Sequence, residues 1–181
     1  MLALLLLALP FWETMDPKDW TEEQLDDISR VSPWSREEGF LATAKPLQWA
    51  EAEWKRRHIA RNRKTEAAVL FEDDYREFLK QHGSTHVVFA VRVTRPHDLA
   101  DEKEIRDMEK ECYLRNGRQK LKLVAHFPPN SSDPYLRLVF PRPQSIEKTL
   151  KLSLYLPGVE KPYRELEFFP KEMTFQGKLE Y

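Results

Sequence analysis

The spacing of apolar residues changes after Gly83, and this change limits the possible fold more than any other feature of the chain. From Thr65 to Gln81, apolar residues recur at intervals of three and four, which places them on one face of a helix. From Thr85 to Val93 the chain is rich in β-branched residues, which favour a strand. The C-terminal third consists of strand-like runs separated by proline-rich joints. Helical segments followed by a strand-rich end predict an α+β domain with a mainly antiparallel sheet.

We expect about three helices packed on a sheet of roughly five strands. The helices are predicted over residues 48–64, 65–81 and 99–114. A further helix begins at Thr21, where Gln24 has the position that completes a capping box. Strand-like segments cover residues 39–43, 85–93, 121–127, 135–140, 149–156, 163–169 and 174–181. Residues 149–156 alternate most cleanly, which predicts one buried and one exposed face.

The first nine residues contain no polar side chain. A run of this length is too short to span a bilayer, which takes about 20 helical residues, and it matches the apolar part of a secretory signal, roughly 7–15 residues. Neither a basic segment before the run nor a small-x-small cleavage site after it is present. We expect residues 1–14 to be either a signal peptide or an N-terminal apolar anchor. A signal peptide whose upstream part is missing would explain why no basic segment precedes the run.

Residues 15–181 are then expected to form a single domain. We expect this domain to be exported to the periplasm or secreted, either free or tethered to the membrane. In this interpretation only the N-terminal segment contacts the membrane. The alternative is a cytoplasmic protein in which the apolar N-terminus is part of the core.

Charge and cysteine content exclude some classes of function. The formal net charge is −1, whereas general nucleic-acid binders are normally basic, so no nucleic-acid partner is expected. The basic run at residues 55–64 distributes its charge around a helix, which is typical of a solvated surface. The single cysteine, Cys112, cannot form an intramolecular disulfide and is expected to be a packed thiol.

Several short motifs follow one another in a characteristic order. They are Lys18-Asp19-Trp20-Thr21-Glu22-Glu23, Ser32-Pro33-Trp34-Ser35, Gln48-Trp49-Ala50, Val139-Phe140-Pro141-Arg142 and the ending Phe169–Glu180, which contains Gly177-Lys178-Leu179-Glu180. In this order the motifs resemble a group of uncharacterised, predicted exported bacterial proteins. The resemblance covers both ends of the chain. It implies export and no known activity, and it supplies no catalytic residues.

All five tryptophans lie in the first third of the chain. Trp20, Trp34 and Trp49 either clamp the N-terminal segment onto the sheet or form an exposed aromatic face. Together with Lys178 in the C-terminal tail, they are the candidate surface for an unknown protein or envelope partner. This gives the leading hypothesis, a non-catalytic binding or assembly module of the cell envelope that uses no cofactor and no metal.

The alternative hypothesis is an envelope enzyme or metal-binding protein built on His82, His86, His97 and Asp98. Histidines four residues apart can share a metal on a helix, but Gly83 lies between His82 and His86. A His–Asp pair orients a nucleophile in hydrolases, yet no serine of this chain lies in a Gly-x-Ser-x-Gly turn. The sequence therefore predicts no catalytic residue.

Overall fold

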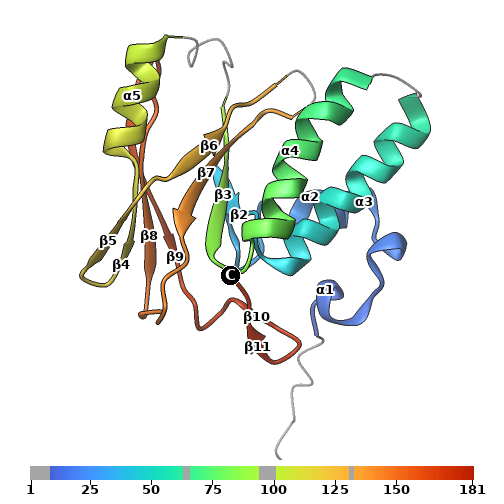
Figure 1. The fold of residues 1–181 in the computed structure, drawn as a ribbon. Coiled ribbons are helices and arrows are strands. Elements are labelled where there is room, and N and C mark those ends of the chain that lie inside the picture. Colours follow the sequence, from blue (N-terminus) through green and yellow to red (C-terminus); the bar gives the residue numbers. More distant parts are fainter. Residues whose placement is uncertain (1–8, 63–65, 94–100, 131–132) are drawn as a thin grey trace, which may run out of the picture.

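The computed structural model describes residues 9–62, 66–93, 101–130 and 133–181, and it describes no side chain between residues 60 and 73. The predicted α+β class with mainly antiparallel sheets is confirmed (Figure 1). Within the described residues, the helices are α1 (Phe11–Thr14), the 3-10 helix η1 (Pro17–Asp19), α2 (Glu22–Asp27), α3 (Lys45–Asn62), α4 (Glu66–His82) and α5 (Glu102–Glu111). Thr21 and Gln24 form the predicted capping box at the start of α2.

The described strands form three antiparallel sheets. The first has the order β1-β2-β3-β7-β6, the second the order β5-β4-β8-β9, and the third is the hairpin β10–β11. Their bounds are β1 Ser35–Arg36, β2 Gly39–Leu41, β3 His86–Arg92, β4 Tyr113–Asn116, β5 Gln119–Lys122, β6 Ala125–Phe127, β7 Tyr135–Pro141, β8 Leu150–Tyr155, β9 Tyr163–Phe168, β10 Thr174–Phe175 and β11 Lys178–Leu179. A second sheet was not predicted from the sequence.

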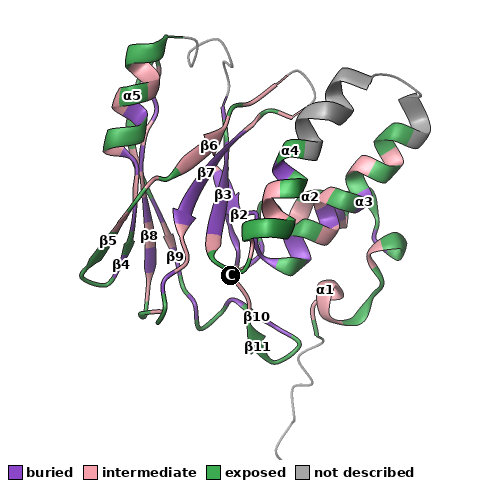
Figure 2. Ribbon diagram, viewed as in Figure 1, coloured by how far each residue is buried: buried purple, intermediate pink, exposed green. Residues whose placement is uncertain are grey.

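The five-stranded sheet lies between two other layers, with α3 and α4 on one face and the four-stranded sheet on the other (Figure 1). The ring of Phe89 on β3 lies 5.2 Å from the ring of Phe168 on β9, which joins the two sheets. Because both of its faces are covered, the middle of β3 and of β7 is buried at five consecutive positions. Figure 2 shows this concentration of buried residues along β3 and β7.

Strand β8 has one face packed in the core, and its residues alternate between buried and half-buried, as the sequence predicts. Because both faces of β7 are buried, apolar and polar residues alternate only imperfectly over residues 135–140. The same register places Phe40, Ala90, Arg137 and Phe127 in one row across four strands, on the face that meets α3 and α4.

Three predicted elements were wrong in extent. The helix predicted over residues 99–114 ends at Glu111, because Cys112 is extended and the next residues pair with β8 as β4. The strand predicted over residues 121–127 is divided between β5 and β6, which belong to different sheets. The strand predicted over residues 174–181 is a hairpin, because Gln176 and Gly177 turn the chain with φ of 49° and 71°.

The N-terminal segment packs on the domain earlier than the predicted boundary at residue 15. The ring of Phe11 lies 5.2 Å from Trp20, and the ring of Trp12 lies 6.1 Å from Trp34. The carboxylate of Glu13 accepts a hydrogen bond from the backbone N–H of Gln176 at 2.9 Å. The packed part of the chain therefore includes α1. Of the helices in the described residues, none is both long enough and apolar enough to cross a membrane.

Candidate functional site

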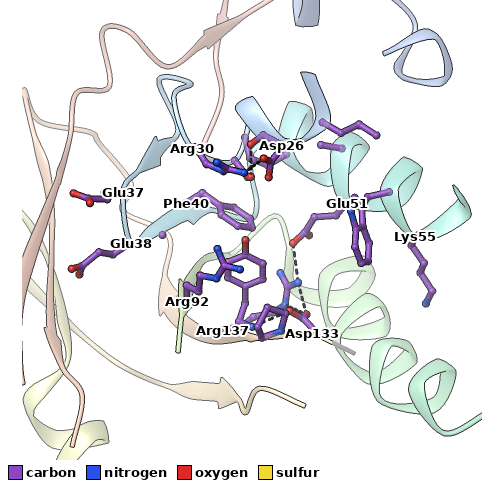
Figure 3. A pocket seen from close by; sticks show the side chains of 18 residues that line it. Asp26, Arg30, Glu37, Glu38, Phe40, Glu51, Lys55, Arg92, Asp133 and Arg137 are labelled. Atoms are coloured by element: carbon purple, nitrogen blue, oxygen red, sulfur yellow. Dashed lines mark hydrogen bonds and ion pairs between the residues drawn. The ribbon is translucent and has the colours of Figure 1, made fainter. Parts of the chain in front are cut away.

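A pocket of about 310 Å³ opens between α2, α3 and the helix-facing side of β2, β3 and β7. We call it the α2–α3 pocket. Figure 3 shows the side chains around it, with Phe40 in the middle and Glu51, Arg137 and Asp133 together at one side. Helix α3 supplies Glu51, β7 supplies Arg137, and the loop before β7 supplies Asp133.

Arg137 is the buried charge of this site. Its Nη2 atom donates to Glu51 Oε1 and to Asp133 Oδ2, both at 2.8 Å, and its Nε atom donates to Asp133 Oδ2 at 3.3 Å. Burial alone would lower the pKa of Arg137, but the nearby carboxylates outweigh it, so the pKa is raised well above its usual value. Burial also raises the pKa of Glu51, although Arg137 opposes this shift. We call Glu51, Asp133 and Arg137 the Arg137 cluster.

The backbone on both sides of Asp133 holds its carboxylate in position to bind Arg137. Its backbone N–H donates to the side-chain oxygen of Asn130 at 3.0 Å, and its own Oδ1 accepts from the backbone N–H of Tyr135 at 3.0 Å. An aspartate that caps the backbone two residues later is held in one orientation. Its second oxygen is therefore fixed toward Arg137.

Aromatic side chains form the rest of the pocket wall. The rings of Phe40 and Tyr135 meet edge to face at 5.0 Å. Arg92 is paired with Tyr135 in the sheet register, and its side chain has no hydrogen bond or ion pair with any other side chain that the structure describes. At the rim, Trp54 is 53% exposed and stacks on the ring of His58 at 5.0 Å. The rim also contains an ion pair between Arg30 and Asp26.

A second hollow of about 400 Å³ lies on the other side of the Arg137 cluster, between α3 and α4. We call it the α3–α4 hollow. Both cavities are lined by Glu51, Asp133, Arg137 and Lys55. The ring of Tyr75, on α4, lies 4.2 Å from the guanidinium carbon of Arg137. The Arg137 cluster is thus a wall shared by two cavities.

The predicted interaction surface is largely part of the core. Trp20 and Trp34 are fully buried, and the indole N–H of Trp34 donates to the backbone oxygen of Glu180 at 2.8 Å. Trp49 is half-buried and meets Phe175 edge to face at 5.3 Å, whereas Lys178 is exposed on β11. The structure therefore brings Trp34 and Trp49 to the C-terminal tail, but Trp20 and Trp34 offer no exposed ring.

The alternative histidine site is only partly within the described residues. The rings of His82 and His86 lie 5.7 Å apart, and both contact Phe78. His97 and Asp98 lie outside the described residues. In the part of the chain that the structure describes, no group of three His, Cys, Asp or Glu side chains is placed to hold a metal ion. Cys112 is buried, and burial raises the pKa of its thiol to about 11, so it is a poor nucleophile at neutral pH.

The chemistry that this arrangement supports is binding. Each charge of the Arg137 cluster is compensated by a neighbour. Glu51, Tyr75, Asp133 and Arg137 were not predicted from the sequence as site residues. One feature of the sequence could have indicated a buried ion pair. Arg137 interrupts the otherwise apolar segment Leu136–Phe140, and an arginine is almost never buried without a partner.

Fold and site together define an α+β domain with a ligand-sized pocket next to a buried ion-pair cluster. Comparison of the chain with models of known protein families, with curated proteins and with solved structures finds no match in any of the three.

Proposed function

We propose that this protein is an exported, non-catalytic binding module of the cell envelope, and that its ligand occupies the α2–α3 pocket. The observation that carries the proposal is the combination of the Arg137 cluster, an aromatic wall and the available cation Arg92 in one cavity. Its volume of about 310 Å³ is that of a small-ligand site, for which roughly 300–1,000 Å³ is usual.

The lining indicates the class of ligand. The half-buried ring of Tyr135, against which the buried Phe40 packs, offers an edge to an apolar or aromatic body, and Trp54 at the rim can stack on it. Arg92 can donate to a carboxylate or another acceptor group on that body. We therefore propose a small organic molecule with an apolar body and one acceptor group.

The proposal of export is based on the apolar residues 1–9. The packing of α1 limits where a signal peptide could be cleaved. Removal of residues up to 14 would take away Phe11, Trp12 and Glu13, which contact the core and the C-terminal tail. If the N-terminal segment is cleaved in the cell, cleavage therefore occurs before Phe11. N-terminal sequencing of the protein from its host tests this, and a mature protein that starts at residue 15 would contradict it.

The binding proposal can be tested with the fluorescent dye 1-anilinonaphthalene-8-sulfonate, which has aromatic rings and one anionic group. We expect saturable binding in the α2–α3 pocket, weakened about ten-fold by Trp54→Ala and by Arg92→Gln, since each removes one contact worth about 1–2 kcal/mol. Arg118→Gln, a change of the same charge in the exposed turn between β4 and β5, is the control and should bind like the original protein. Unchanged dye binding in both pocket variants would contradict the proposal.

A further inference from the structure

Two residues that line the α3–α4 hollow carry buried polar atoms without a hydrogen-bond partner. Nη1 of Arg137 and the hydroxyl of Tyr75 both lack a partner, although the two residues are only 7% and 6% exposed. The other guanidinium nitrogens, Nε and Nη2, are occupied by Asp133 and Glu51. Buried polar atoms are nearly always hydrogen-bonded, because an unpaired one loses its interaction with water without replacement. Two such atoms on residues that line the same cavity point to a ligand group.

Both atoms are suited to an acceptor. The guanidinium has only donors, and its raised pKa keeps it charged. Burial raises the pKa of Tyr75, so its hydroxyl keeps the proton and can donate. The carbon of the guanidinium is 4.2 Å from the centre of the Tyr75 ring, which places the two donors on adjoining groups.

The described charges of the hollow differ from those of the α2–α3 pocket. Among the side chains that the structure describes, the hollow is lined by four cations and two carboxylates, whereas the pocket is lined by four cations and five carboxylates. The cations that line the hollow are Lys55, Arg76, Lys80 and Arg137. Lys80 also pairs with Glu77 at 3.5 Å on the exposed side of α4, a contact that water weakens. These charges favour an anion more strongly in the hollow than in the pocket.

We infer that the α3–α4 hollow is a second binding site, which takes the carboxylate of a small organic acid on Arg137 Nη1 and the Tyr75 hydroxyl. A carboxylate has two oxygens in one plane and can accept from two neighbouring donors at once. The side chains of Leu79 and Ala52 supply an apolar surface for the body of the acid. This site goes beyond the proposed function, since it lies in a different cavity and adds Tyr75 and Lys80, which do not line the α2–α3 pocket.

Isothermal titration calorimetry with benzoate tests the inference on the full chain. Benzamide, which has the same ring and no charge, is the control ligand. We expect benzoate to bind at one site at least about ten-fold more tightly than benzamide, because hydrogen bonds to charged groups are the stronger ones. Tyr75→Phe should weaken benzoate binding about ten-fold and Lys80→Gln by a smaller factor, whereas Arg118→Gln should leave it unchanged.

Tyr75→Phe keeps the ring under Arg137 and removes a hydroxyl without a hydrogen bond, so the variant should fold normally. Equal binding of benzoate and benzamide would overturn the inference, as would a Tyr75→Phe variant that binds benzoate like the original protein. Inorganic phosphate that binds as tightly as benzoate would also overturn it, since the site would then select charge and not a carboxylate. Loss of benzoate binding in Arg92→Gln but not in Tyr75→Phe would place the acid in the α2–α3 pocket and refute the second site, without affecting the proposed function.

Discussion

The carboxylate of Glu51 lies 2.8 Å from Nη2 of Arg137, and this ion pair joins helix α3 to the interior strand β7. The two side chains are 27% and 8% exposed, so most of the pair is shielded from water. A pair in such surroundings is stable only while both partners are present, because each charge alone would be costly to bury. The shared wall of the two cavities therefore depends on both residues.

Replacement of Arg137 by methionine should destabilise the fold by about 3–5 kcal/mol, because Glu51 and Asp133 would lose their cationic partner. Urea denaturation at pH 7 measures the free energy of unfolding. The combined variant Arg137→Met, Glu51→Leu should recover a large part of the loss, since an apolar pair replaces the buried charges. A single variant that loses less than about 1 kcal/mol would show that the ion pair does not hold the wall together.

Glu53 should make the stability depend on pH in the acid range. Its carboxylate accepts from Arg56 at 2.7 Å and from Arg57 at 2.6 Å, and these bonds lower its pKa to about 2. Because the pKa is lower in the folded than in the unfolded chain, the stabilisation is complete above the ordinary carboxyl pKa. It is lost as pH falls through about 2.

Glu53→Gln should therefore remove about 1–3 kcal/mol at pH 7 and flatten this part of the acid response, as followed by urea denaturation between neutral and low pH. Glu102→Gln is the control, since Glu102 makes only an exposed ion pair with Arg106 at 3.4 Å. An acid response that is the same in the Glu53→Gln variant would contradict the assignment.

Truncation should show where the packed chain begins. Removal of residues 1–9 leaves α1 in place and gives the reference chain. Removal of residues 1–14 should cost about 2–4 kcal/mol relative to this reference, because it also deletes two aromatic rings that pack on Trp20 and Trp34. Thermal denaturation of both truncated chains gives the comparison, and equal stability would restore the predicted boundary at residue 15.

The fold class was predictable because the chain has strong local signals. The capping box at Thr21 and Gln24 and the alternation of residues 150–155 depend on neighbours in sequence, and both are present in the structure. The end of the helix before Cys112 was not predictable in this way. The apolar residue Leu114 fits a helical or a strand pattern, and its pairing with Leu121 of β5 and Leu152 of β8 selects the strand.

The site was less predictable than the fold, because it depends on long-range contacts. Glu51 and Arg137 are far apart in sequence, and only the packing of α3 on β7 brings them together. The tryptophans were visible in the sequence, but their burial was not. Trp34 is fixed in the core by a hydrogen bond to Glu180 near the other end of the chain, and Trp54 is the one that remains 53% exposed.

Cys112 should be unreactive in the folded protein. Its thiol is buried against β8, accepts from the backbone N–H of Tyr155 at 3.3 Å, and has a pKa raised to about 11. At pH 8 its thiolate fraction should be about 100-fold lower than in the unfolded chain, and its exposure is lower as well. The rate of reaction with a disulfide reagent, with and without urea, measures this, and comparable rates would refute the packed-thiol assignment.

The most direct test of the binding function is native mass spectrometry of the protein purified from its own host, next to the variant Trp54→Ala, Arg92→Gln. The account predicts a bound small molecule on the original protein, its loss from the variant, and its release in chemically unchanged form. A protein that carries no small molecule, or a variant that retains the same one, would contradict the claim that the α2–α3 pocket is a binding site.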